Sequence, residues 1–179
     1  MVVSLYAGRD AVRAYVAEQA ALGLDHVYAL VKADRDAMVA MIEDLGEDEA
    51  QVPPGADEYS APQVIEHLNA SFTRSIERLS TLSSGRPWSA TGPAPSRGGL
   101  PEESPPSFAE TRRRFIEGED GVLAVLKAVE GTKGLDLTAD HADFGPFNWL
   151  QWAVYSHHVH TSDHLGQVAA LRELILSRR

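Results

Sequence analysis

The stretch that decides the fold is PFNWLQWAVYSHHVHTSDHLGQVAALRELILS, which covers residues 146–177. Pro146 suits the first turn of a helix, because a residue there has no intrahelical partner for its backbone N–H. Apolar residues recur at helical spacing as far as Ser177. At about 1.5 Å per residue, this helix would be roughly 45 Å long. The sequence therefore predicts one long C-terminal helix, which carries four of the seven histidines.

The N-terminal part of the chain also shows helical spacing. Residues 9–22 predict a short first helix. Residues 24–45 carry apolar side chains at three- and four-residue steps, which form one stripe on a long helix. No segment shows the sustained alternation of apolar and polar residues that is typical of strands.

Two more helices are marked by their first residues. Ser60, with Gln63 three positions later, forms a capping box and predicts a helix that ends near Ser83. Ser107 caps the next helix in the same manner, and that helix ends at Gly131. Four substantial helices without strands predict an all-α fold, a four-helix bundle with a short extra N-terminal helix.

Two loops are expected between the helices. Residues 84–107 are rich in Pro, Gly and Ser and lack periodicity. A loop of this length is either a functional segment, such as a lid over a binding site, or a mobile connector. Residues 132–145 are expected to form a second loop. At 179 residues we expect one domain over 1–179, with the long loop inside it.

The composition excludes several classes of function. The chain has no cysteine, so any thiol chemistry needs a thiol brought in by a small molecule. Its 16 basic and 26 acidic residues give a net charge of −10, which disfavours binding to nucleic acids or anionic membranes. No apolar run approaches the length of a transmembrane helix, and the first residues do not form a signal peptide. We expect a cytoplasmic protein that acts on a small-molecule substrate.

His160 and His164 are the first candidates for a functional site. Four residues apart, they share one face of the predicted helix, and this face continues through apolar positions toward the core. Two imidazoles at this spacing can reach one metal ion at about 2.0–2.1 Å each. Separate hydrogen bonds of ordinary helix histidines explain the pair equally well. His157, one turn earlier, is a candidate ligand or a neighbour of the ligands, whereas His158 points elsewhere and is expected at the surface.

Two motifs resemble those of the DinB-like superfamily, which includes the YfiT-type metalloenzymes. The first is YSAPQVIEHL at residues 59–68, in which an aromatic residue and a serine precede His67. The second is HTSDHLGQ at residues 160–167, in which a histidine pair precedes Gly-Gln. The segment FGPFNWL at residues 144–150 is similar to a stretch before the last helix in one branch of the superfamily. The resemblance covers roughly residues 24–176.

The resemblance implies that His67, His160 and His164 together bind one divalent metal ion. Two positions depart from the usual pattern. Tyr59 stands where tryptophan is common, and Asp163 stands where many relatives carry a histidine. Neither departure removes a ligand.

Three imidazoles would leave at least one coordination position for water or substrate. All-nitrogen ligation suits zinc, nickel, copper or iron, and zinc or nickel is expected here. The resemblance implies a thiol-dependent S-transferase, in which the metal activates a low-molecular-weight thiol, or a hydrolase or isomerase that uses the same open position. The alternative is a non-catalytic dimeric bundle whose metal site is structural or vestigial.

Three polar residues lie close to these histidines in the sequence. Gln167, one turn past His164, is the strongest candidate for a role in the site, although a helix hydrogen bond or interhelical contact explains it more simply. Glu66 is adjacent to His67 and is expected to be solvated or paired. Asp163 points away from the face of the histidine pair. No catalytic base or nucleophile can be named from the sequence.

Aromatic residues near the start of the last helix predict self-association. Trp149 is expected to face inward on the side of His160, whereas Trp152 and Tyr155 turn toward the outer seam of the bundle. Aromatic residues are enriched at interfaces, and twofold dimers are the commonest soluble oligomers. We therefore expect a homodimer. The alternative is that these aromatic residues pack beneath the 132–145 loop.

Overall fold

A computed structural model describes residues 2–55, 58–88, 107–129 and 134–179 of the chain. Most of this part is helical, and the fold is all-α with one small two-stranded sheet. No helix in the described ranges is long and apolar enough to cross a membrane. The elements in chain order are η1 (Leu5–Ala7), α1 (Arg9–Ala21), α2 (Leu24–Ile42), α3 (Glu47–Ala50), α4 (Ala61–Ser83), α5 (Phe108–Ala128), β1 (Thr138–His141), β2 (Gly145–Asn148), α6 (Trp149–Ala153), η2 (Val154–Val159) and α7 (His160–Leu176).

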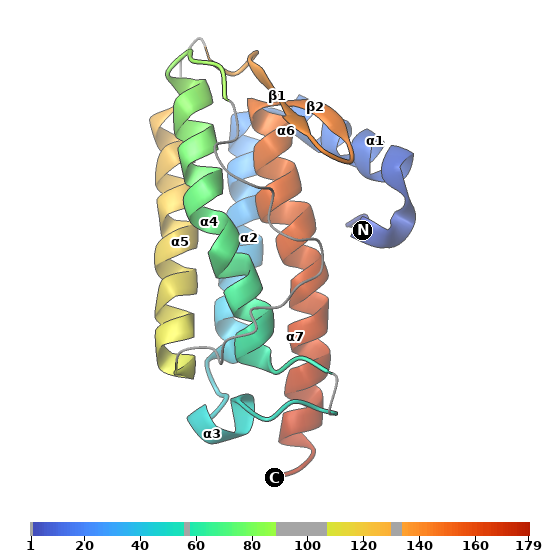
Figure 1. Cartoon of the computed structure of the whole chain (residues 1–179), viewed down its shortest axis with the longest axis vertical. Helices are drawn as coiled ribbons and strands as arrows, with labels where there is room; N and C mark the ends of the chain where they lie inside the picture. The colour runs from blue at the N-terminus through green and yellow to red at the C-terminus, as the bar shows by residue number, and fades with distance from the viewer. Residues whose placement is uncertain (1, 56–57, 89–106, 130–133) are drawn as a thin grey trace.

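The predicted four-helix bundle is confirmed. Figure 1 shows α2, α4, α5 and the continuous run α6–η2–α7 lying side by side along the long axis. Helix α1 lies beside α6 at one end of the bundle, and α3 lies near the C-terminus at the other end. Helix α4 runs antiparallel to α7, so residues far apart in the chain face each other across this pair.

Helices α4 and α5 run in the same direction, so the end of α4 and the start of α5 lie at opposite ends of the bundle (Figure 1). The segment 84–107 therefore connects two points at opposite ends of the bundle. The predicted role of this segment as a lid lies outside the described residues, because 89–106 are among those not described.

Both predicted helix starts are confirmed by their hydrogen bonds. The Ser60 backbone N–H donates to the side-chain oxygen of Gln63 over 2.8 Å, which is half of the expected capping box. The Ser107 hydroxyl accepts from the backbone N–H of Glu110 over 3.2 Å. These bonds satisfy N–H groups that the first turn of a helix leaves without partners, so the starting residues follow from the local sequence.

Gly118 lies in α5 where this helix meets α4. A Cβ atom at this position would come within 2.3 Å of the Phe72 ring, so only glycine allows the observed approach. The ring of Phe72 packs edge-on against Phe115, which is fully buried. Helix α5 is unbroken through Gly118 and Gly121, although two glycines so close together are unfavourable in an isolated helix.

The segment 132–145 was expected to be a loop, and the last helix was expected to begin at Pro146; both expectations are wrong. Strands β1 and β2 form an antiparallel hairpin in which Thr138 pairs with Asn148, and Pro146 lies within β2. A two-stranded sheet consists of edges, where proline is tolerated. The helix begins one residue after Asn148, whose side chain accepts from the backbone N–H of Gln151 over 2.9 Å.

The hairpin covers the aromatic residues that were expected at an outer seam. The Trp152 side chain is 4% exposed, and its indole N–H donates to the carbonyl of Ala139 in β1 over 3.0 Å. The Tyr155 ring packs edge-on against His141 of the same hairpin. The seam prediction for Trp152 and Tyr155 is therefore wrong, and the alternative of packing beneath 132–145 holds. The homodimer therefore stays a prediction, and the aromatic residues Trp152 and Tyr155 no longer support it.

Trp149 faces inward, as expected. It is fully buried, and its indole N–H donates to the backbone carbonyl of Leu79 in α4 over 2.7 Å. This bond joins the first turn of the C-terminal run to the last turns of α4. The two helices that carry the candidate site are thus anchored to each other at one end.

Candidate metal centre

The C-terminal run changes its winding just before the candidate histidines. Residues Val154–Val159 form a π-helical turn, η2, between α6 and α7. A π turn holds one more residue than an α turn and is frequent at functional sites. Since η2 ends directly before His160, it sets the rotation of α7 relative to α6. Both histidines of the i, i+4 pair face α4 as a result.

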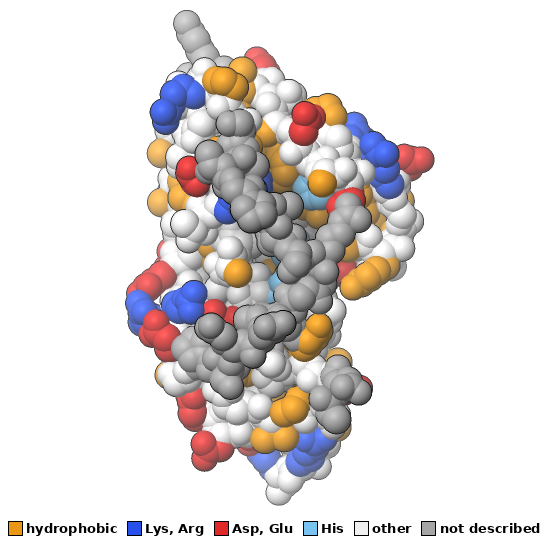
Figure 2. Space-filling view, viewed as in Figure 1, with side chains coloured by type: hydrophobic (Ala, Val, Ile, Leu, Met, Phe, Trp, Pro, Cys, Tyr) orange, Lys and Arg blue, Asp and Glu red, His pale blue; other side chains and the backbone are white. Residues whose placement is uncertain are grey.

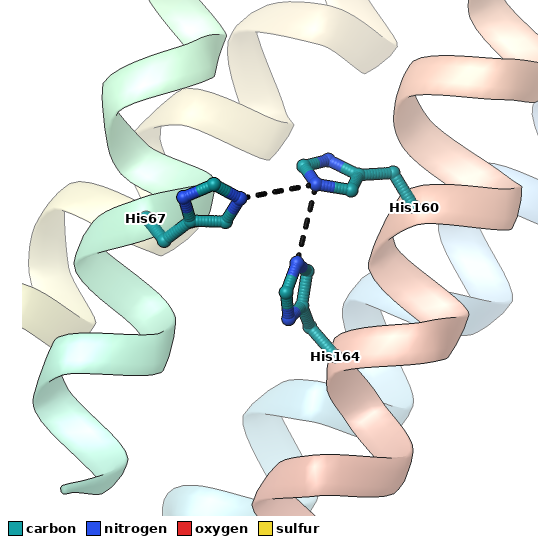
Figure 3. A group of neighbouring side chains, drawn as sticks. All are labelled: His67, His160 and His164. Carbon is teal, nitrogen blue, oxygen red and sulfur yellow. Dashed lines mark hydrogen bonds between the residues drawn. The ribbon is translucent and has the colours of Figure 1, made fainter. Parts of the chain in front are cut away.

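The structure brings together the three histidines that the motifs single out. His67 extends from α4, while His160 and His164 extend from α7, and the rings point toward one another (Figure 3). The Nε2 atom of His160 lies 3.2 Å from Nε2 of His67 and 3.2 Å from Nε2 of His164. One nitrogen from each ring falls within 4.8 Å of the others, and each residue is partly exposed. We call this group the histidine triad.

The spacing of the triad fits a metal ion better than hydrogen bonds alone. A ring nitrogen offers one N–H or one lone pair, so Nε2 of His160 can form a hydrogen bond with only one of its two neighbours. A tetrahedral ion with metal–nitrogen bonds of 2.0–2.1 Å would set its ligand nitrogens about 3.3–3.4 Å apart. The observed distances of 3.2 Å are close to this spacing. The residues present therefore fit one divalent ion.

Burial keeps the triad in the neutral form that a metal requires. Desolvation, together with charge repulsion from the neighbouring His164 and His67, lowers the pKa of His160 to about 3. Desolvation is also the main reason why the pKa values of His67 and His164 lie below the usual value of a histidine. Neutral imidazoles with free lone pairs bind divalent ions without first losing a proton.

Gln167 orients one member of the triad. Its side-chain oxygen lies 2.8 Å from Nδ1 of His164, so Nδ1 carries the proton and donates. The Nε2 atom of His164 is then left with a lone pair that faces the other two rings. Metal-binding histidines commonly use their second nitrogen in this way. The sequence had favoured a simple helix hydrogen bond for Gln167, and the observed bond acts directly on the triad.

His157 lies outside the triad, so its candidacy as a ligand is not supported. Its Nε2 atom is 2.6 Å from the Ser75 hydroxyl, and its Nδ1 atom is 3.6 Å from a carboxylate oxygen of Glu119. Both His157 and Glu119 are fully buried. The other oxygen of Glu119 accepts from the hydroxyl of Thr161 at 3.5 Å. This group joins α4, α5 and the C-terminal run in the core, and the sequence held no signal for it.

His158 was expected at the surface, and this expectation is wrong, because its side chain is buried. Its Nδ1 atom lies 2.5 Å from a carboxylate oxygen of Asp34 in α2, and its Nε2 atom lies 2.8 Å from the Tyr15 hydroxyl in α1. The second oxygen of Asp34 accepts from the hydroxyl of Ser162. The extra residue of η2 places His157 and His158 against different neighbours, and both are buried.

The two carboxylates beside the triad in sequence have other surroundings. Glu66, which was expected to be solvated or paired, is buried and paired. One oxygen lies 3.0 Å from the Arg114 guanidinium, and the other accepts from the Asn69 amide over 2.8 Å. Asp163 acts on His164 through its charge, which raises the pKa of that histidine against the effect of burial.

A mainly apolar groove of about 350 Å³ lies one turn from the triad. Val64 lines it three residues before His67, and Gln167 lines it three residues after His164. Apolar side chains beside a few polar groups are the usual lining of small-molecule sites. In Figure 2, histidine atoms are visible at the surface between α4 and the C-terminal run. The groove was not predicted from the sequence. Its other lining residues are Pro54, Glu58, Tyr59, Ala170, Leu171 and Leu174.

The fold is a four-helix bundle, and three imidazoles from two antiparallel helices converge beside a groove. These features define a class of helical proteins with a candidate site for one metal ion. The comparison with protein families agrees with this class. The family model of the DinB superfamily matches residues 30–168, which include the whole triad. The chain therefore belongs to the DinB superfamily. A search of curated proteins found no match to it.

Proposed function

We propose that this protein is an enzyme that depends on one divalent metal ion, zinc or nickel, held by His67, His160 and His164. The strongest support is that Nε2 of His160 lies 3.2 Å from Nε2 of both His67 and His164, with one ring nitrogen from each residue within 4.8 Å of the others. Membership of the DinB superfamily and the motifs that resemble its metalloenzymes are compatible with it. Three nitrogen ligands suit zinc, nickel, copper or iron, and among these we propose zinc or nickel.

A catalytic role is favoured over a structural one by the surroundings of the triad. Structural zinc sites are closed by four protein ligands, whereas catalytic sites have three and keep one position open. Among the described residues, the group whose ligand atoms lie close enough together contains three members, each of them partly exposed. The groove with Val64 and Gln167 in its lining adjoins the triad and offers space for an organic substrate.

The reaction that we propose is attack of the sulfur of a low-molecular-weight thiol on a carbon of an organic acceptor, in which a new C–S bond forms, the thiol proton is lost and a leaving group departs from that carbon. A divalent ion in the triad would lower the pKa of a bound thiol or water. Because the chain has no cysteine, the thiol must come from a co-substrate. Gln167 keeps Nε2 of His164 free of a proton, and the apolar groove offers the acceptor a surface to pack against. Hydrolysis or isomerisation at the same position is the alternative.

Metal analysis of the purified protein tests the metal centre. We expect close to one divalent ion per chain, and loss of the ion in His160→Ala. The matched control is His26→Ala, which removes a partly exposed histidine that contacts Gln19 in α1. This variant should retain the metal. Full metal retention in the double variant His67→Ala, His160→Ala would falsify the assignment.

Turnover of a reactive organic acceptor with small thiols tests the reaction. The protein loaded with zinc or nickel should accelerate consumption of the thiol, and His160→Ala should remove the acceleration. Equal rates for the two proteins would exclude catalysis by the triad. Acceptor loss that needs the triad but no thiol would instead favour the hydrolase or isomerase.

A further inference from the structure

Two arginines share a face of α4 with the metal triad. Arg74 and Arg78 follow His67 by seven and eleven residues, which places both within about 20° of His67 around the helix. Helix α4 thus presents a histidine and, two and three turns later, a pair of cations on one side. That side faces the C-terminal run, because His67 meets His160 across the same seam.

Arg78 is held between aromatic rings rather than by an acid. Its guanidinium lies 3.6 Å from the centre of the Trp152 ring and 5.7 Å from that of Trp88. Its Nε atom is buried without a hydrogen-bond partner. Burial and the Arg74 charge lower the pKa of Arg78 to about 10, so the side chain is charged at neutral pH. A charge that is desolvated in this way is costly unless an opposite charge binds to it.

The chain has a net charge of −10, so acids outnumber bases and could pair with these two arginines. Within the described residues, neither Arg74 nor Arg78 forms an ion pair. Several other described arginines also lack an ion pair, and what distinguishes Arg74 and Arg78 is their place on the face of α4 that carries His67. Other arginines of the chain do contact carboxylates: Arg35, Arg113, Arg114, Arg172 and Arg179.

The arginine pair and the triad are close enough for one small molecule to reach both. Trp152, beneath the Arg78 guanidinium, precedes His160 by eight residues, which is about 12 Å along a helix. His141 and Tyr155 link the two places. The rings of these two residues are 4.7 Å apart, and burial raises the pKa of Tyr155 while the nearby Arg78 charge opposes this rise.

We propose that Arg74 and Arg78 form an anion-binding subsite for a carboxylate or phosphate of the same molecule whose reacting atom binds at the triad. The planar fork of an arginine matches both groups with two parallel hydrogen bonds. The ligand class is then an organic thiol or substrate with an anionic group about 10–12 Å from its reacting atom. This size corresponds to a small peptide. The identity of the reacting atom rests on the proposed function, whereas the anion site does not.

The other explanation for Arg78 is that it only packs on Trp152 and stabilises the hairpin. Binding of ophthalmate separates the two roles, because ophthalmate is the tripeptide glutathione with a methyl group in place of the thiol. Calorimetry at constant ionic strength should show binding of ophthalmate to the purified protein. The affinity should fall at least about tenfold in Arg78→Gln and in Arg74→Gln. Inorganic phosphate, as a second probe, distinguishes a phosphate site from a carboxylate site.

The matched control is Arg112→Gln, which also removes an arginine that lies over an aromatic ring, that of Phe108 in α5. It should bind ophthalmate as the unchanged protein does. Arg78→Lys keeps the charge without the fork and should bind with intermediate affinity. If neither ophthalmate nor phosphate binds, or if both glutamine variants bind them as tightly as the unchanged protein, the subsite is refuted. If Arg78→Gln does not fold, the affinity of Arg74→Gln for ophthalmate tests the subsite on its own.

A second comparison distinguishes failure of the subsite from failure of the proposed function. The metal-loaded protein should bind glutathione more tightly than its diethyl ester, and Arg78→Gln should remove this preference. Equal affinity of the acid and the ester in the unchanged protein would overturn the subsite and leave the metal centre standing. If His160→Ala binds ophthalmate normally while no metal binds to the unchanged protein, the subsite stands and the proposed function fails.

Discussion

The C-terminal run carries two groups of histidines whose surroundings differ. His157 and His158, in η2, are each held by a carboxylate and a hydroxyl group, from Glu119 and Ser75 in one case and from Asp34 and Tyr15 in the other. In the triad one turn later, the Nε2 atoms contact one another, and no acid is bonded to them within the described residues.

The comparison shows that the partner, more than the position in the sequence, decides what a histidine does. In His158 an acid and a hydroxyl bond to the two ring nitrogens, whereas in His157 a hydroxyl bonds to Nε2 and a carboxylate oxygen lies 3.6 Å from Nδ1, and both side chains belong to the core. In His164, Nδ1 donates to the Gln167 side-chain oxygen, so Nε2 keeps a lone pair that can bind a metal ion. The same residue type therefore serves two purposes within two turns of one helix. Four variants or conditions test this difference, taken in order of expected effect.

Glu119→Ala should have the largest effect, on stability rather than on metal binding. It leaves a cavity and removes the acid beside His157, at a fully buried position. We expect a loss of about 3 kcal/mol in the free energy of unfolding, measured with urea. The metal content should stay the same. Glu117→Ala, at an exposed position of the same helix, should change stability by less than about 0.5 kcal/mol. Loss of metal from Glu119→Ala at an unchanged fold would contradict the separation of the two groups.

Acid should destabilise the metal-free protein through the triad. The folded chain holds the pKa of His160 at about 3, whereas the unfolded chain has the ordinary value of 6.5. Below pH 6.5 the unfolded state binds the extra proton, so stability is complete above this pH and falls as the pH drops toward 3. His160 alone should cost about 2 kcal/mol at pH 5. Unfolding curves at pH 7 and pH 5 measure the loss, which should be smaller in His160→Gln. The same loss in both proteins would contradict the prediction.

Gln167→Ala should weaken the metal centre without removing it. The variant frees Nδ1 of His164, so the ring can rotate and exchange tautomers. We expect the metal affinity to fall about tenfold, which competition with a chelator can measure. Gln151→Ala is a control of the same type, because Gln151 bonds to Asn148 at a helix start away from the triad. Metal affinity in that variant should not change.

Tyr15→Phe should have the smallest effect. It removes the hydroxyl that contacts His158, and the cost should be about 1 kcal/mol of stability. Neither metal content nor turnover should change, since this contact joins α1 to η2 and does not reach the triad. A tenfold change in metal affinity would show that the two groups of histidines are coupled.

The bundle and the triad could be predicted because their signals are local. Ser60 and Gln63 lie within one turn, and the HxxxH spacing of His160 and His164 places both on one face whatever packs against them. Only the meeting with His67, across 93 positions of the chain, depended on the resemblance to a family.

The features that were missed depend on contacts between distant segments. The strands of the hairpin have four residues each, and one contains Pro146, so no alternating pattern marks them. His158 was misplaced because its position was derived from regular α-helical spacing, which η2 interrupts. The partners Tyr15 and Asp34 lie more than 120 positions before it, on two other helices. The arginine pair was not singled out, because only the packing shows that Arg74 and Arg78 lack acids.

The π turn η2 also restricts the length of this chain. Deleting one residue from Val154–Val159 would let the run become a regular α-helix, and everything before the turn would rotate by about 100° relative to everything after it. Trp149 could then not keep its bond to Leu79, nor Trp152 its bond to the hairpin, if His160 still faced His67. Insertions and deletions should therefore be excluded from these six positions in related chains, while sequence changes are tolerated there.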